Sequence, residues 1–299
     1  MDFIETMKNR LIHRAVECCP HCHSKKIVKF GLMKNKRQRY KCNGCRRTFS
    51  QFTKTPISYS KKPLEIWATY IVALSNAMTI KMSANISSIC QTTSFYWRHK
   101  LLNSLKIQGE EELENEVQLK EFVMPKSNIG NHKDKTIIWR RQRYRHSICL
   151  PSVKLVSCVD TNKNRGIFPI DDIITGTQIK NYILPKIKTK SILRTRRYKL
   201  YVPCAIEKSI EVKEFKLYEG NHMNSDFASL QQMDFRIFLK NFRGVSTKYL
   251  TFYSNWFIWL KKNDYGQYLS LMDMIMTGMN KLRIYEFPRV NLRGQVVGA

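Results

Sequence analysis

The sequence predicts a modular α/β protein, in which a metal-stabilised hairpin and a group of three short helices precede a mixed α/β core. Three observations support this prediction. Two C-x-x-C pairs stand near the N-terminus, with nineteen residues between them. Apolar residues then recur at three- and four-residue steps from residue 64, as they do on a helix. From residue 117 onward, strand-like segments are interleaved with helical ones, which is typical of a mixed α/β domain.

The two C-x-x-C pairs are the most specific motif in the chain. They are Cys19 with Cys22 and Cys42 with Cys45. Their spacing falls in the range of a four-thiolate zinc site, because two such turns can aim four sulfurs at one tetrahedral ion. The segments 27–31 and 39–41 between the pairs are expected to form a hairpin, which makes the whole a zinc ribbon. Too few apolar residues lie here to bury a core, so a structural Zn²⁺ would supply the folding free energy.

Other interpretations of these cysteines are weaker. Disulfides are disfavoured because the charged N-terminal residues lack the apolar stretch of a secretory signal. The sequence from Cys19 to His23 also fits the C-x-x-C-H pattern of haem attachment, but that leaves Cys42 and Cys45 unexplained. Cys18 and His21 are adjacent rival ligands, as is His23, yet only Cys19 gives the two-residue gap to Cys22.

The charge balance points to an anionic partner. The 299 residues include 52 Lys and Arg against 23 Asp and Glu, a formal charge of +29 that is spread along the chain. An excess of this size favours phosphate neutralisation, with counterion release driving the affinity. The alternative is a solvated basic surface without a partner. No run of eighteen apolar residues predicts a membrane span, so a cytoplasmic protein without membrane partners is expected.

The three short helices are expected over 64–74, 79–87 and 91–106, an arrangement that fits a helix-turn-helix. In that motif the last helix enters the major groove, and Trp97, Leu101 and Leu105 would be its buried stripe. Plain helical packing with capping hydroxyls is the alternative. The candidate DNA-contacting residues are Thr92, Thr93, Ser94, Tyr96, Arg98, His99 and Lys100, together with Arg46 and Arg47 of the hairpin.

The rest of the sequence predicts the linkers, the other strands and helices, and the domain boundaries. Composition predicts linkers at 51–62 and near 109–116, a basic loop over 131–146, and a C-terminal tail with no strong signal. Expected strands are 117–123, 152–160, 165–170, 199–204 and 215–218, and expected helices are 177–187, 227–242 and 248–261. The expected domains are 1–52 (zinc ribbon), 63–108 (helix-turn-helix), 116–262 (core) and 263–299 (tail).

Four segments together carry a resemblance to a known family. They are CPHC…KCNGCRRTFS in the hairpin, TTSFYWRHKLL (92–102), EVQLKEF (116–122) and FRGVSTKYLTFYSNWFIWL (242–260). On these segments, from about Cys19 to Leu260, the chain resembles a bacterial insertion-sequence transposase of the zinc-ribbon, DDE type. The resemblance implies an RNase-H-like core and DNA cleavage and joining by acidic residues that hold two divalent metal ions.

The resemblance also locates the expected acids, and here the chain departs from the family pattern. Lys120 lies at the first acid position, Cys204 at the second and Gln232 at the third. None of the three is a carboxylate, so the catalytic centre is expected to be degenerate, with Mg²⁺ needed only by an active enzyme. Glu121 and Asp234 remain as candidate catalytic acids. A one-residue slip to Glu121 would turn every side chain of the strand to the other face.

The expected function is therefore that of a transposase-family DNA-binding protein with lost or weakened strand transfer. One alternative is an active enzyme with displaced acids, and the other is a zinc-ribbon nucleic-acid regulator without nuclease ancestry. The displaced acids would be drawn from Glu121, Glu207 or Asp160, and Asp226 or Asp234. The resemblance implies double-stranded DNA at mobile-element ends as the partner, a homo-oligomer on that DNA, and association with the bacterial nucleoid.

Overall fold

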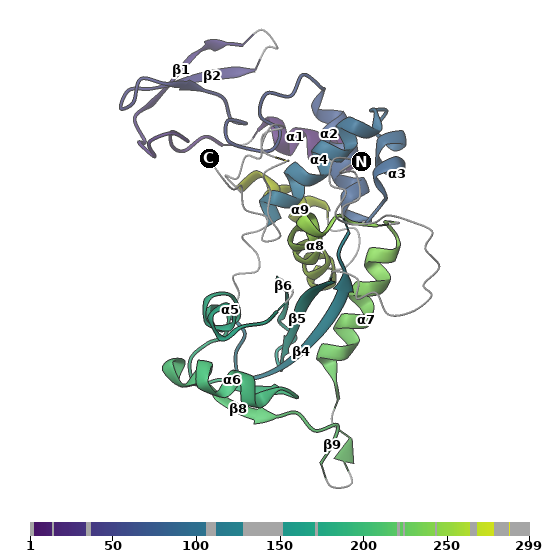
Figure 1. Ribbon diagram of the computed structural model, residues 1–299. Helices are drawn as coiled ribbons and strands as arrows, with labels where there is room; N and C mark the ends of the chain where they lie inside the picture. The colour runs from purple at the N-terminus through teal and green to yellow at the C-terminus, as the bar shows by residue number, and fades with distance from the viewer. Residues whose placement is uncertain are drawn as a thin grey trace. The chain divides into compact units, whose positions relative to one another are not determined.

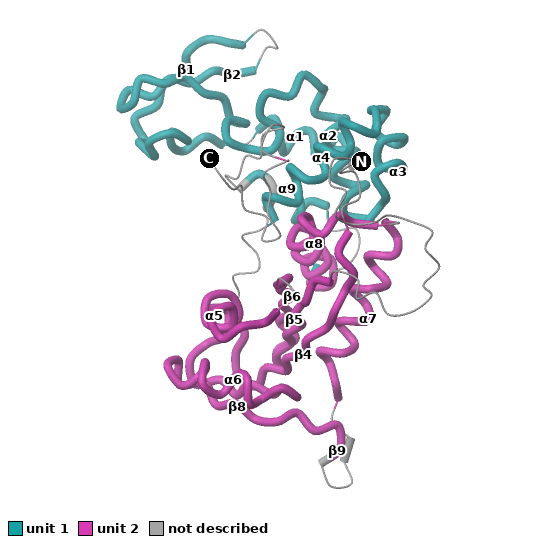
Figure 2. Tube along the Cα trace, in the orientation of Figure 1, with its two compact units in different colours: residues 1–105, 263–284 teal, residues 106–262, 285–299 magenta. Residues whose placement is uncertain are grey.

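The computed structural model divides into two compact units that alternate along the chain. Unit 1 comprises Met1–Leu105 and Asn263–Ile284, and unit 2 comprises Lys106–Lys262 and Tyr285–Ala299 (Figure 2). The structure describes residues 3–13, 15–33, 37–105, 112–127, 152–170, 173–219, 222–223, 225–242, 244–263, 268–277 and 287. The predicted basic loop 131–146 lies outside the described residues, as does most of the chain beyond 277.

The N-terminal hairpin is a three-stranded antiparallel sheet, and residues 15–50 are called the ribbon below. It contains β1 (Ile27–Leu32), β2 (Gln38–Cys42) and β3 (Thr48–Phe49), which confirms the predicted hairpin. The buried apolar residues of its small core are Cys19, Cys42 and Phe49. Tyr40 stacks on Phe49 with ring centroids 5.7 Å apart. Such a core is too small to offset the entropy of ordering the backbone, so the ribbon depends on its cysteines.

The helices of unit 1 pack around paired tryptophans. They are α1 (Phe3–Ile12), α2 (Leu64–Ser75), α3 (Ile80–Ile86), α4 (Gln91–Ser104) and α9 (Tyr268–Thr277). Trp67 of α2 stacks on Trp97 of α4, with ring centroids 3.4 Å apart. The Thr79 hydroxyl caps α3 by accepting from the Met82 N–H. The three helices predicted over 64–106 are confirmed, and α9, which the sequence did not predict, contacts α2 and α4.

The segment 51–62 is folded against its neighbours, so its interpretation as a linker is wrong. Phe52, Thr55 and Ile57 are buried, and successive turns are closed by backbone hydrogen bonds. The Gln51 amide donates to the carbonyls at the end of α1, and the Trp67 indole donates to the Ser60 hydroxyl at 2.8 Å. We call residues 51–62 the connecting segment, and its polar composition hides its buried side chains.

Unit 2 is built on a five-stranded mixed sheet in the order β6-β5-β4-β7-β8. The strands are β4 (Glu116–Pro125), β5 (Ser152–Asp160), β6 (Arg165–Ile170), β7 (Ile192–Thr195) and β8 (Glu211–Glu214). The pairs β4·β5 and β5·β6 are antiparallel, whereas β4·β7 and β7·β8 are parallel. The first strand, β4, is central, with two antiparallel neighbours on one side and two parallel neighbours on the other. This is the RNase-H-like order, and the predicted fold class is confirmed.

Helices cover both faces of this sheet (Figure 1). On one face, α7 (Phe227–Lys240) contacts β4 and β5, and α8 (Leu250–Lys262) contacts β6. The other face is covered by the irregular helix α5 (Gly176–Gln178), η2 (Ile179–Ile183) and η3 (Leu184–Lys186), and by α6 (Tyr198–Ala205) with η4 (Ile206–Lys208). The short elements β9 (Tyr218–Glu219), β10 (His222–Met223) and η5 (Thr247–Tyr249) complete the unit. No helix in the described ranges is long and apolar enough to cross a membrane.

Two predicted strands of the core are wrong. Residues 199–204 lie in α6, where Tyr201, Cys204 and Ala205 turn one face toward the core at helical spacing. The strand parallel to β4 is instead β7, which the sequence hides because Arg194 interrupts its apolar run. The Arg194 side chain pairs with Glu116 of β4 at 2.7 Å, so the strand accommodates it. The segment 215–218 is not one strand, because residues 215–217 lie between β8 and β9 and only Tyr218 belongs to β9.

Candidate metal centre and nucleic-acid interface

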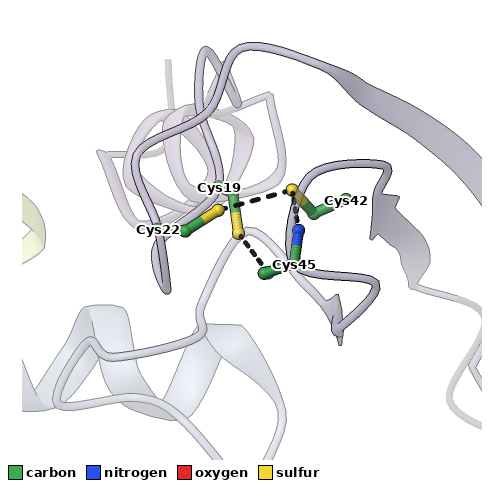
Figure 3. A group of neighbouring side chains, drawn as sticks. All are labelled: Cys19, Cys22, Cys42 and Cys45. Carbon is green, nitrogen blue, oxygen red and sulfur yellow. Dashed lines mark hydrogen bonds between the residues drawn. The ribbon is translucent and has the colours of Figure 1, made fainter.

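Four cysteine side chains converge at the end of the ribbon (Figure 3). Cys19 and Cys22 lie on one loop, whereas Cys42 ends β2 and Cys45 lies in the turn that follows it. The Cys19–Cys45 and Cys22–Cys42 Sγ atoms are each 3.6 Å apart, and all four sulfurs lie within 4.8 Å of one another. A tetrahedron with metal–sulfur bonds of about 2.3 Å has edges of about 3.8 Å. The four thiols therefore form a group that could hold one metal ion.

The two cysteine loops have the same backbone design. In each, the fourth residue after the first cysteine is left-handed, His23 with φ 59° and Arg46 with φ 57°. This turn brings backbone N–H groups toward sulfur, so that His21 N–H donates to Cys19 Sγ and Cys45 N–H donates to Cys42 Sγ. The Cys45 N–H is the main reason why the pKa of Cys42 is lowered to about 6. The second loop thus favours the thiolate form of Cys42 that a metal ion requires, whereas the pKa of Cys22 on the first loop is raised to about 11 beside the other three sulfurs.

The rival ligands are not part of this group. His21 packs edge-on against Phe49, with ring centroids 6.4 Å apart, and burial followed by nearby cations lowers its pKa. Cys18 and His23 also lie outside the convergent set. Across the described residues, the four cysteines are the one group of three or more His, Cys, Asp or Glu side chains placed to share a metal ion.

Two hollows in unit 1 meet at the connecting segment. The first, which we call the ribbon hollow, has a volume of about 520 Å³, and the second, the helix hollow, about 750 Å³. Both are lined by Ser58, Tyr59 and Ser60, so they adjoin at these residues, and we call the two hollows together the groove. The cationic lining of the ribbon hollow is Arg37, Arg39 and Arg47, and that of the helix hollow is Lys61, Lys62 and Lys100.

Of the predicted DNA-contacting residues, only some reach this groove. Arg47 lines the ribbon hollow, and Thr93 and Lys100 line the helix hollow, where burial lowers the pKa of Lys100. Arg46 and Thr92 are exposed elsewhere in unit 1, and Tyr96 is half-buried.

The placement of three residues on α4 corrects the sequence interpretation. Arg98 is fully buried and donates to the Met78 carbonyl and the Ser83 hydroxyl, so it cannot contact a phosphate. His99 and Ser94 are also buried, with 1% and 0% exposure, and Ser94 bonds the Tyr70 hydroxyl within the helical core. All three stabilise the helical packing instead of reading DNA.

Sequence reasoning misses several residues that the groove presents. Arg37, Arg39, Lys61 and Lys62 are not among the predicted contacts, although basic residues are dense around positions 34–39 and 61–62. Tyr59 is missed because its segment has the composition of a linker. Only the fold of that segment shows that these side chains line one groove.

In unit 2, the strand position of the first expected acid is occupied by a cation. The Lys120 ammonium on β4 bonds the Ser229 hydroxyl of α7 and lies 3.7 Å from Asp226 Oδ2. Arg196, directly after β7, approaches the same Asp226 oxygen at 3.5 Å. Asp226 itself caps α7 by accepting from the Ser229 N–H at 2.8 Å. Two cations therefore face one carboxylate, an arrangement that repels divalent metal ions.

The two remaining candidate acids are not brought together. Side chains alternate along β4, so Glu121 points to the face opposite Lys120 and α7. There it accepts a hydrogen bond from Tyr201 at 3.0 Å and pairs with Arg197. Burial, followed by the Glu121 charge, raises the pKa of Tyr201. Asp234 lies on α7 and pairs with Lys261 at 2.8 Å.

The residues at the other two expected acid positions, Cys204 and Gln232, both lie in helices. Cys204 lies in α6 and packs into the core, with its Sγ 3.7 Å from the Gly176 carbonyl, so it does not end a strand. Gln232 is half-buried on α7. Its neighbour Gln231 is buried and donates to Ser157 and to two carbonyls of β5 and β6, which ties α7 to the sheet.

Comparisons with known proteins find similarity among solved structures alone. No family model and no curated protein matches this chain. The Mos1 transposase paired-end complex with left transposon end is similar over 74% of this chain and 79% of that chain, with 12% sequence identity and a TM-score of 0.32. A pre-cleavage Mos1 transpososome and the Mos1 strand transfer complex are similar over the same share of this chain, at 12% identity and TM-scores of 0.29.

Proposed function

We propose that this chain is a DNA-binding protein related to bacterial insertion-sequence transposases of the zinc-ribbon, DDE type. In this proposal unit 1 binds double-stranded DNA at mobile-element ends, and unit 2 is a core with lost or weakened strand transfer. The observation that carries the proposal is the groove of unit 1, which is lined by six cationic side chains.

The groove suits a phosphate backbone for electrostatic reasons. Cations line both of its hollows, and Ser and Thr hydroxyls between them offer hydrogen bonds to phosphate oxygens. The whole-chain charge of +29 adds attraction at longer range. The four cysteines would hold a structural Zn²⁺, because thiolates suit this ion and because the ribbon has so small a core of its own.

The side chains of the core favour the hypothesis of weakened catalysis over that of an active enzyme. Strand transfer by two metal ions needs several carboxylates around one point. Lys120 and Arg196 instead converge on Asp226, while Glu121 points to the other face of the sheet. An active enzyme with displaced acids is the second candidate. A zinc-ribbon regulator without nuclease ancestry is disfavoured, because the strand order of unit 2 is RNase-H-like. Assembly as a homo-oligomer on DNA and a place in the bacterial nucleoid belong to the same proposal.

Removing exposed cations from the groove is expected to weaken DNA binding. The variant Arg39→Ala/Arg47→Ala/Lys62→Ala should bind a fluorescent duplex roughly 10-fold to 100-fold more weakly in a titration of anisotropy at about 0.1 M salt. The slope of log affinity against log salt should fall by about 0.9 for each phosphate that the variant no longer neutralises. All three side chains are exposed, so the fold should be unaffected.

A charge-matched control separates the groove from net charge. Lys25→Ala/Lys26→Ala/Lys29→Ala removes the same charge from exposed positions of the ribbon that do not line the groove. This variant should keep most of the affinity of the wild type. Equal losses in both variants would mean that the groove has no special role. Failure of the wild-type protein to bind any duplex at low salt would refute the proposed function.

Strand cleavage is expected to be absent or very weak. The wild-type protein is incubated with Mg²⁺ or Mn²⁺ and a duplex that carries the ends of its own element, and the products are resolved on a denaturing gel. The physical reason is that Lys120 stands at the first acid position implied by the resemblance, and that Lys120 and Arg196 both face Asp226, so divalent cations would be repelled there. Efficient cleavage that Glu121→Ala abolishes would favour the active enzyme instead, with Lys120→Ala as the neighbouring control.

A further inference from the structure

Tyr59 is displayed at the junction of the two hollows. Its side chain is 85% exposed, the largest value among the exposed large apolar and aromatic side chains of the described residues. It lines both the ribbon hollow and the helix hollow. An aromatic ring with so much of its surface exposed gains little of the free energy of burial.

The backbone presents Tyr59 in a fixed and unfavourable conformation. Its φ is 60°, in the left-handed region that a residue with a Cβ rarely adopts. Glycine would occupy such a position with less strain. The residues on both sides hold the turn, because Ile57 and Ser58 are buried and the Ser60 N–H donates to the Ile57 carbonyl at 3.2 Å. The chain therefore keeps a bulky ring where glycine would be easier, and the turn aims that ring outward.

The surroundings of the ring match the chemistry of a nucleotide. Cations flank it on both sides, with Arg39 and Arg47 in the ribbon hollow and Lys61 and Lys62 in the helix hollow. Phosphates held in the two hollows would leave a base or a sugar between them, beside the ring. A basic groove with an exposed aromatic platform is the combination that binds unpaired nucleotides, because every base has an apolar face.

We propose that Tyr59 stacks on an unpaired nucleobase of DNA bound in this groove. The ligand class is DNA with a single-stranded segment, because bases inside an intact duplex are already covered by their neighbours. This inference rests on the proposed function of unit 1. It adds a distinct recognition element to the phosphate contacts, and it makes the connecting segment part of the binding surface.

The test compares Tyr59→Gly and Tyr59→Phe on two fluorescent probes of equal length. One is a single strand of about 16 nucleotides, a length that spans one such binding site, with 2-aminopurine at its centre. The other is a blunt duplex. Tyr59→Gly should lose about 5-fold to 100-fold in affinity for the single strand, because stacking contributes that much per base. Tyr59→Phe should match the wild type on both probes, and Tyr59→Gly should change duplex affinity by less than about 2-fold.

Two further readouts exclude a merely structural role. The thermal midpoint of Tyr59→Gly should equal or exceed that of the wild type, because glycine relieves the positive φ. The 2-aminopurine fluorescence should be quenched by the wild type and by Tyr59→Phe, but not by Tyr59→Gly. Tyr218→Ala, which removes a 62% exposed tyrosine from unit 2, is the control and should bind as the wild type does.

The outcomes separate this inference from the proposed function. Unchanged single-strand affinity in Tyr59→Gly would overturn the stacking role while leaving duplex binding intact. A lowered thermal midpoint with equal losses on both probes would also overturn it, since the ring would then be structural. If the wild-type protein binds neither probe at low salt, the proposed function itself fails.

Discussion

Replacing Cys42 with serine is expected to unfold the ribbon and abolish its metal binding. The sulfur of Cys42 is fully buried among the other three and accepts the Cys45 N–H, and a serine oxygen is shorter and harder than a thiolate. Structural zinc contributes about 10–16 kcal/mol in isolated zinc-finger peptides. The buried apolar residues of the ribbon core are three, so burial cannot replace this contribution.

Metal content and local folding measure this effect separately. Plasma mass spectrometry should find about one zinc per wild-type chain and much less in Cys42→Ser. Amide resonances of β1 and β2 should collapse toward random-coil positions in the variant, or in the wild type treated with a chelator. Cys18→Ser is the matched control, because Cys18 lies beside Cys19 yet outside the convergent group. Equal metal content in Cys42→Ser and in the wild type would contradict the assignment of the site.

Replacing Trp97 with alanine is expected to cost about 3–5 kcal/mol of the stability of unit 1. The Trp97 ring is only 6% exposed, stacks on Trp67 and meets Tyr70 edge-on with ring centroids 5.4 Å apart. Removing it leaves a cavity between α2 and α4, which the surrounding helices can close only in part. The stacked pair of tryptophans thus holds α2 and α4 together.

Urea unfolding followed by far-ultraviolet circular dichroism checks the magnitude. Unit 1 should unfold at a clearly lower urea concentration in Trp97→Ala than in the wild type. The unfolding of unit 2 should depend on urea in the same way in both proteins. Thr92→Ala, an exposed change on the same helix, should shift stability by no more than about 0.5 kcal/mol. A similar small shift in Trp97→Ala would mean that the tryptophan pair is not the centre of this packing.

The helical part of unit 1 shows what periodicity can and cannot reveal. The predicted buried stripe of Trp97, Leu101 and Leu105 is confirmed, because apolar spacing reports directly on the packed face of a helix. The sequence suggests Arg98 as a phosphate contact because charged side chains usually face water. Its burial depends on the Met78 carbonyl, which lies twenty residues earlier in the chain and has no sequence signature.

The core shows the same limit for strands. The alternation in β4 and the hairpin of β5 and β6 are predictable, since each has a clear period of two. The four-residue β7 escapes prediction because Arg194 makes it look like a basic loop, and only Glu116 on the neighbouring strand explains its place. Without β7, Cys204 looks like the end of a strand, and Arg196, which faces Asp226, is overlooked.

The cysteine site is predictable because its ligands are local pairs, whereas the groove is not. The lining of the groove comes from the ribbon, the connecting segment and α4 together. Convergence of distant segments on one surface follows from tertiary packing, which a single sequence does not display. Tyr59 is the clearest instance, since nothing in its neighbours' composition distinguishes it from a residue in a linker.

Helix α9 has a consequence for how the protein is made on the ribosome. Its Leu271, Met272 and Met276 are buried, and Asp273 pairs with Arg10 of α1 at 2.7 Å. During synthesis, the first 105 residues therefore emerge long before the helix that completes their core, and the chain must build the sheet of unit 2 in between. A nascent or prematurely terminated chain would carry an unfinished N-terminal unit with apolar surface open to chaperones and proteases.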